Sequence, residues 1–141
     1  MGEDLIYAHE CMRIKNGGKS GIQHLIKCIP DALAVGFDIN SRELNETFRC
    51  IEVKTTISRR PLSFNRFTLT KNEWNAAVSF GERYYVYRLF ISKGEKRLLL
   101  IQDPVGQYKK GKLAVTSRNG KDISFDPSKC GKFVELLEWN N

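Results

Sequence analysis

The sequence lacks any long apolar run, because no stretch approaches the roughly 20 apolar residues with which an α-helix crosses a bilayer. We therefore expect no membrane partner. The N-terminus, MGEDLIYAHEC, also lacks the basic region of a secretory signal peptide, since acids stand in its place. The protein is accordingly expected not to be secreted and to reside in the cytoplasm, or in the nucleus of a eukaryote.

Close pairs of metal-binding cysteines are also missing. No Cys-x-x-Cys occurs, and His9 and His24 are far apart in the sequence. These spacings argue against a structural zinc site. Without an export signal the thiols are expected to stay reduced, and they are Cys11, Cys28, Cys50 and Cys130.

The chain has no internal repeat, no low-complexity segment and no zinc-finger or helix-turn-helix pattern. Its 141 residues fit a single domain, which we assign to residues 1–141. Basic residues are in excess, because 23 Lys and Arg against 16 Asp and Glu give a formal net charge of +7. This excess favours a polyanionic partner such as nucleic acid, although many small domains are basic for solubility alone.

Two segments carry the signals of amphipathic helices. Residues 3–15, EDLIYAHECMRIK, place acids early and bases late, which suits the helix dipole, and a Gly-Gly pair follows as a stop. The second helix begins after Thr70, because Thr70 and Glu73 form the T-x-x-E pattern of a capping box, and it ends at Gly81. The capping box by itself accounts for Glu73.

Other segments are rich in β-branched and aromatic residues, which is typical of strands. Residues 34–41 and 48–56 are joined by the short polar link RELNET, so we expect an antiparallel hairpin. Residues 21–29 fit a strand or a helix, and we favour a strand. Further strands are expected at 67–69, 83–92 and 96–103, with strand-like flanks around a turn at 118–121 and a strand or helix at 132–139. The order predicts an α/β fold with a mixed central β-sheet flanked by helices.

Three charged residues interrupt the apolar hairpin. Asp38 lies in VGFDIN, and Glu52 and Lys54 lie in RCIEVKTT. The period of two places Glu52 and Lys54 on one face of their strand, and Asp38 can lie across from them. Converging carboxylates repel each other unless a cation intervenes, and hard ions such as Mg²⁺ take oxygen ligands.

The pattern therefore predicts a Mg²⁺ or Mn²⁺ site formed by Asp38, Glu52 and the backbone carbonyl of Val53. A metal there lowers the pKa of a bound water, and Lys54 would orient the nucleophile or stabilise transition-state oxygens. The triplet is short, and a solvated cross-strand face is the alternative interpretation. The apolar neighbours of both acids favour the interior site.

Four blocks, VGFDIN, IEVKTT, FTLTKNEWNAA and YYVYRLF, follow one another in this order. The order resembles the PD-(D/E)XK nuclease superfamily. Within it, the blocks are similar to an Mrr-like branch that includes the domain at the C-terminus of the plant protein NO VEIN and domains of bacterial restriction and defence proteins. The resemblance covers residues 34–103, and it departs from the superfamily signature at Phe37, where a proline would precede Asp38.

The resemblance implies a restriction-endonuclease-like core of helix, three strands, helix and strand over residues 3–103, with 104–141 as a C-terminal extension. It also implies a metal-dependent endonuclease that hydrolyses phosphodiester bonds, chiefly in DNA, in a restriction, defence or mobile-element setting. Asp38 matches the family aspartate, and Glu52 and Lys54 match the acid and lysine of the motif.

In such sites an acid on the first helix often completes the metal ligands. The resemblance therefore makes Glu10 our candidate for this acid, with Glu3 as the second choice. A plain surface glutamate is the alternative interpretation of Glu10.

Contacts to nucleic acid are expected from Arg59, Arg60, Arg66 and Lys71, since arginine forks suit phosphate oxygens. The aromatic residues of 84–90 could stack on bases, but packing in the core and on the sheet explains them better.

Cutting both strands of a duplex needs two active sites, so a homodimer or a subunit of a larger defence assembly is expected. Two other functions stay open. One is a catalytically silent nucleic-acid-binding or protein-interaction module on the same fold, and the other is an RNase of the same superfamily.

Overall fold

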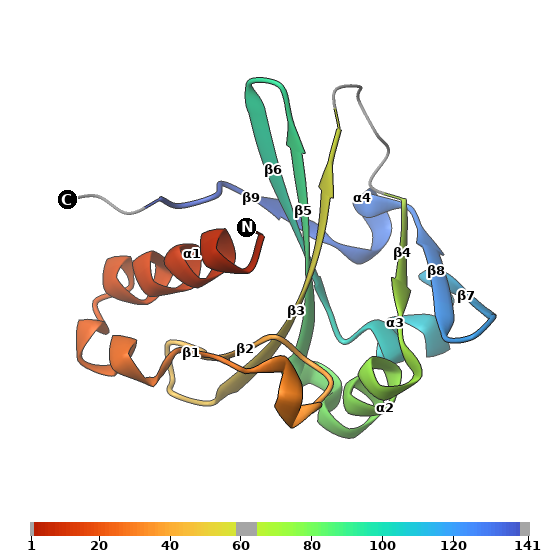
Figure 1. The fold of residues 1–141 in the computed structure, drawn as a ribbon, viewed down its shortest axis with the longest axis horizontal. Helices are drawn as coiled ribbons and strands as arrows, with labels where there is room; N and C mark the ends of the chain where they lie inside the picture. The colour runs from red at the N-terminus through yellow and green to blue at the C-terminus, as the bar shows by residue number, and fades with distance from the viewer. Residues whose placement is uncertain (1, 59–64, 139–141) are drawn as a thin grey trace.

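A six-stranded mixed sheet runs through the centre of the molecule, as a computed structural model that describes residues 2–58 and 65–138 shows (Figure 1). The strand order is β1-β2-β3-β5-β6-β9. β3 and β5 are parallel, whereas the other neighbouring strands are antiparallel. The strands span Lys27–Cys28 (β1), Ile39–Arg42 (β2), Phe48–Ile57 (β3), Tyr84–Ser92 (β5), Glu95–Gln102 (β6) and Lys132–Val134 (β9).

Helices cover this sheet, so the predicted α/β architecture is confirmed, and it is compatible with a restriction-endonuclease-like fold. The α-helices are α1 (Gly2–Asn16), α2 (Lys71–Phe80), α3 (Pro104–Lys109) and α4 (Pro127–Cys130). Short 3₁₀ turns are η1 (Ser20–Leu25), η2 (Asp31–Leu33) and η3 (Gly81–Arg83). No helix in these described ranges combines the length and the apolar character needed to cross a membrane.

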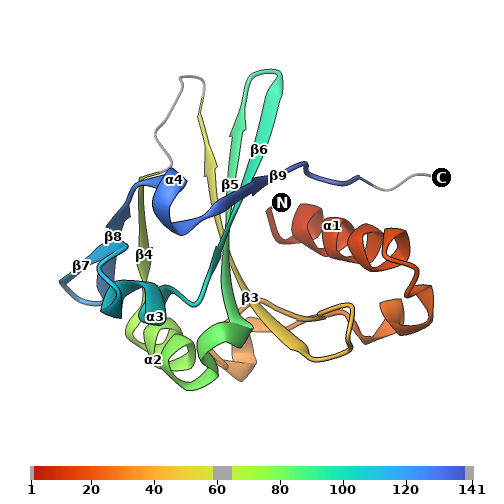
Figure 2. The same cartoon turned by 180° about the vertical axis from the view of Figure 1, so that it is seen from behind.

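A second, three-stranded antiparallel sheet lies across the central sheet from α1 (Figures 1 and 2). Its order is β4-β8-β7, with β4 at Arg66–Leu69, β7 at Leu113–Ser117 and β8 at Lys121–Phe125. The predicted turn near residue 120 joins β7 to β8. Sequence reasoning did not predict a second sheet, and residues 104–138 contribute to both sheets.

Apolar side chains fill both faces of the central sheet. Alternation along β5 sends Tyr85 and Tyr87 towards α1, and Tyr84 and Phe90 towards the side of α2, α3 and the second sheet. All four rings are buried, so packing accounts for them. The site residues described below lie on the α2 side of β3.

Both expected helices form. In α1 the acids Glu3 and Asp4 stand in the first turn and bases in the last, as the dipole favours. In α2 the capping box is complete, because the Thr70 hydroxyl accepts from the Glu73 N–H and the Glu73 carboxylate accepts from the Thr70 N–H. Gly81 then ends the helix at positive φ.

Two predicted strands differ from the structure, and one open alternative is decided by it. Residues 21–29 form mainly a 3₁₀ turn, and only Lys27–Cys28 is a strand, because the turn packs beside α1 with Ile22 and Ile26 in the core on that side. The strand expected at 34–41 begins at Ile39, since η2 and a left-handed Ala34 occupy the preceding stretch. For the stretch expected as a strand or a helix at 132–139, the described residues form the short strand β9 at Lys132–Val134 and no helix, and Trp139 lies outside the described residues.

Candidate active site

Asp38 is fixed against the middle of β3, immediately before β2 begins. Its N–H donates to the carbonyl of Ile51 (2.8 Å), and its Oδ2 accepts from the N–H of Val53 (2.8 Å). The β2–β3 pairing begins at Ile39 and Ile51, and the Asp38 carboxylate just before it lies close enough to Glu52 to raise the pKa of Glu52 beyond the effect of burial. The predicted juxtaposition of these two acids is therefore present.

Glu52 and Lys54 share one face of β3, as the period of two predicts. The Lys54 Nζ lies 3.2 Å from Glu52 Oε2, and the Glu52 side chain is almost fully buried. A buried carboxylate needs a cationic partner or a proton, because desolvation disfavours its charged form. Lys54 supplies part of that compensation in the structure.

Helix α2 adds an acid that sequence reasoning assigned to capping alone. Glu73 Oε1 accepts from the Thr70 N–H (2.8 Å) and also from Lys54 Nζ (2.9 Å), so one oxygen serves the capping box and an ion pair. The signal was present in the block LTKNEW, where Glu73 stands in the first helical turn. Glu73 can cap α2 and bind Lys54 at the same time, because Lys54 approaches its carboxylate from β3.

The loop before Asp38 packs directly on α2. Gly36 has φ of +88°, and a Cβ built there would lie 2.6 Å from the Ala76 Cβ and 2.8 Å from the Asn72 carbonyl oxygen. The Asn72 side-chain amide donates to the carbonyl of Ala34 (2.8 Å). Only glycine permits this approach and this backbone conformation, so the VGFDIN and KNEW blocks together position Asp38.

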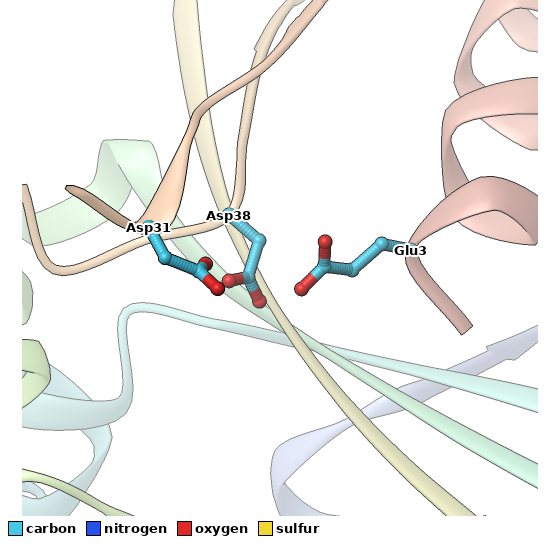
Figure 3. A group of neighbouring side chains, drawn as sticks. All are labelled: Glu3, Asp31 and Asp38. Carbon is cyan, nitrogen blue, oxygen red and sulfur yellow. The ribbon is translucent and has the colours of Figure 1, made fainter. Parts of the chain in front are cut away.

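Two further acids converge on Asp38 from the outer side. Figure 3 shows the carboxylates of Glu3, Asp31 and Asp38 turned towards one another, and one oxygen of each lies within 4.8 Å of the others. Glu3 comes from the first turn of α1 and Asp31 from η2, and both side chains are exposed. Asp38 therefore stands between Glu52 and this pair.

The structure corrects the assignment of Glu10. Its carboxylate is buried elsewhere and accepts hydrogen bonds from Arg13, Ser41 and Tyr87. Seven residues along a helix correspond to about 10 Å, so Glu3 and Glu10 cannot both reach Asp38. The acid that α1 brings to Asp38 is Glu3, the second choice, and Glu10 belongs to a structural network.

The electrostatics of the site favour a proton or a cation among the acids. Burial and the neighbouring Asp38 raise the pKa of Glu52 to about 9, and burial also raises the pKa of Asp38. Burial lowers the pKa of Lys54, but Glu52 and Glu73 outweigh it, so the net shift is upwards. Burial and then Asp38 and Asp31 raise the pKa of Glu3. The acids together carry more negative charge than Lys54 offsets.

The expected nucleic-acid contacts are only partly described. Arg66 begins β4 and Lys71 begins α2, and both are exposed. Arg59 and Arg60 lie outside the described residues. Lys71 stands two positions before Glu73, so it flanks the site at the start of α2.

These observations define a class of protein: an α/β fold in which acids and a lysine converge on a mixed sheet. Residues 2–101 match the family model described as Protein NO VEIN, C-terminal, so the chain belongs to that family. The matched range contains Asp38, Glu52, Lys54 and Glu73, whereas β7, β8 and β9 lie beyond it. No curated protein and no solved structure matches the chain.

Proposed function

We propose that this protein is a metal-dependent endonuclease of the PD-(D/E)XK superfamily, in its Mrr-like branch, which hydrolyses phosphodiester bonds in DNA. The observation that supports this function best is the convergence of Asp38, Glu52 and Lys54 in a buried setting. Glu52 lies near the carboxylate of Asp38 and 3.2 Å from the ammonium of Lys54, and burial and then Asp38 raise its pKa to about 9. A divalent cation beside Asp38 and Glu52 would offset their negative charge.

The donor atoms suit Mg²⁺ or Mn²⁺, because all are oxygens. The N–H of Val53 points to Asp38, and the N–H and C=O of one strand residue point to the same side, so the Val53 carbonyl faces the same edge as Asp38. Asp38, Glu52 and the Val53 carbonyl would hold the ion. Glu3 and Asp31 adjoin Asp38 and would bind the ion's water ligands or a second ion.

A bound ion would lower the pKa of a water and stabilise charge at the phosphorus. The residues of the chain supply the rest. Lys54 is held by Glu52 and Glu73 and stays charged at neutral pH, because both partners raise its pKa. Lys54 therefore orients the nucleophile or stabilises phosphate oxygens electrostatically, and it does not act as a general base.

Nucleic acid is the polyanion that fits the charge of the chain. The formal net charge is +7, and the exposed bases Arg66 and Lys71 lie on elements next to the site. Arginine forks on phosphates position a duplex without reading its sequence. A restriction, defence or mobile-element role fits such a nuclease.

The test is cleavage of supercoiled plasmid in MgCl₂ or MnCl₂, with EDTA as the metal-free arm and single-stranded DNA and RNA as parallel substrates. Wild type should nick or cut, whereas Lys54→Ala and Asp38→Asn should lose at least about 100-fold in rate with circular dichroism unchanged. Lys93→Ala, in the exposed β5–β6 turn, is the matched control. Cleavage of RNA alone would make the protein an RNase, and salt-sensitive DNA binding without cleavage would indicate a silent module.

A further inference from the structure

Arg88 is a buried cation beside Lys54 that the site described above does not use. In the parallel pair β3–β5, Lys54 is the register partner of Arg88, and Glu52 is the partner of Val86. Register partners on neighbouring strands point to the same face, so Arg88 lies next to Lys54 on the α2 side of the sheet. Only 7% of Arg88 is exposed.

Among the residues that the structure describes, no acidic side chain pairs with Arg88. Within residues 2–58 and 65–138 its guanidinium makes one hydrogen bond, from Nη1 to the backbone carbonyl of Lys54 (3.1 Å), and Nε is buried with no partner. All 16 acids of the chain lie in these ranges, and none of them pairs with Arg88. Burial alone lowers its pKa.

Arg49 shows what a structurally satisfied arginine looks like in this fold. It is just as buried, at 8% exposure, but it donates from Nε and Nη2 to Glu43 and from Nη1 to Tyr87. An unpaired buried guanidinium is costly, because desolvation is not offset by an anion. The contrast indicates that Arg88 is kept for an anion that binds from outside.

We propose that Arg88 binds a phosphate oxygen of the nucleic-acid substrate beside Lys54. This inference rests on the proposed function, since it places the phosphate next to Asp38 and Glu52. The Nη1 bond to the Lys54 carbonyl orients the guanidinium, and the buried Nε keeps an unused donor that a phosphate oxygen would take once the substrate seats against this face. A planar guanidinium suits phosphate oxygens better than the point charge of a lysine does.

The experiment measures binding apart from cleavage. A fluorescent 20-base-pair duplex is titrated in CaCl₂ by anisotropy, with wild type, Arg88→Met, Arg88→Lys and the remote charge control Arg83→Met in η3. We expect Arg88→Met to weaken binding by about 10- to 100-fold, Arg88→Lys to weaken it less, and Arg83→Met to change it by under about 3-fold. The melting temperature of Arg88→Met should be equal to or above that of wild type, because an uncompensated charge is removed.

Any other result of this experiment also tests the phosphate contact of Arg88. Equal binding by Arg88→Met and Arg83→Met overturns the proposal, and so does the absence of duplex binding by wild type. A melting temperature that falls in Arg88→Met, with binding lost in proportion, makes Arg88 a structural residue. If wild type binds through Arg88 but cuts nothing in MgCl₂ or MnCl₂, the nuclease function fails and the phosphate contact stands.

Discussion

The ammonium of Lys54 lies 2.9 Å from the carboxylate of Glu73, so an ion pair ties the first turn of α2 to the middle of β3. The same Glu73 oxygen accepts the Thr70 N–H. Helix capping and the electrostatics of the site therefore depend on one side chain. Replacing Glu73 by residues that keep one function and lose the other separates them.

Glu73→Gln should leave the fold intact and change the pH dependence of cleavage. Glutamine serves in a capping box, so the free energy of unfolding should fall by less than about 1 kcal/mol. Without the Glu73 charge the pKa of Lys54 drops, and the alkaline limb of the pH–rate profile moves to lower pH. Glu73→Ala, which also loses the cap, should cost about 1 kcal/mol more in urea denaturation. An unmoved alkaline limb in Glu73→Gln would contradict this role.

Glu52 should make the metal-free protein less stable as the pH rises. Its folded pKa, near 9, lies above its unfolded value of 4.5, so its contribution is complete below pH 4.5 and is lost as the pH rises through 9. Glu52→Gln mimics the protonated form and should match wild type near pH 5. At pH 9.5 in EDTA it should be more stable by about 2 kcal/mol or more. Thermal melts across this range, with exposed Glu82→Gln as the control, test the prediction.

Divalent cations should stabilise the wild type in a way that depends on Asp38. A ligand at 100 times its dissociation constant adds about 2.7 kcal/mol to the free energy of unfolding. We expect Mg²⁺ or Mn²⁺ to raise the melting temperature of wild type and not of Asp38→Asn. Glu3→Gln should show an intermediate rise, because Glu3 adjoins Asp38, whereas Asp38 itself is a proposed ligand of the ion.

The affinity for Mg²⁺ or Mn²⁺ should also depend on pH. Because burial and the neighbouring Asp38 raise the pKa of Glu52 to about 9, a cation that binds Glu52 near neutral pH must displace its proton. Affinity should therefore increase between pH 6 and pH 9, and calorimetry in buffers of different ionisation enthalpy should detect the released proton. Equal affinity at both pH values would argue against ligation by Glu52.

Sequence reasoning located the site where local rules suffice. The period of two placed Glu52 and Lys54 on one face, and the T-x-x-E pattern placed the start of α2. Sequence reasoning failed where contacts between distant segments determine the position of a side chain. The choice between Glu3 and Glu10 depends on where α1 crosses the sheet, and the isolated charge of Arg88 is visible only once every acid has been located. No periodic pattern carries that information.

Gly36→Ala should damage the fold and the site together. The residue has φ of +88°, and a methyl group would meet the backbone carbonyl of Asn72 at 2.8 Å. Left-handed strain and this clash should lower the free energy of unfolding by more than about 2 kcal/mol, and the loop that carries Asp38 should shift. Gly94→Ala is the matched control, since it has a similar φ of +78° in a turn with no neighbour within 4 Å. A loss no larger than that of Gly94→Ala would show that the approach to α2 is not needed.

Glu10→Gln should destabilise the protein without changing its metal affinity. The Glu10 carboxylate is fully buried and accepts from Arg13, Ser41 and Tyr87, so removing its charge breaks the ion pair that it forms with Arg13. Breaking a buried ion pair costs roughly 3–5 kcal/mol, and partial hydrogen bonding by glutamine should place the loss at the lower end. Manganese titration of the folded variant should give the wild-type affinity, whereas Glu3→Gln should weaken it with little change in stability. A Glu10→Gln protein that folds but no longer binds manganese would return Glu10 to the metal site.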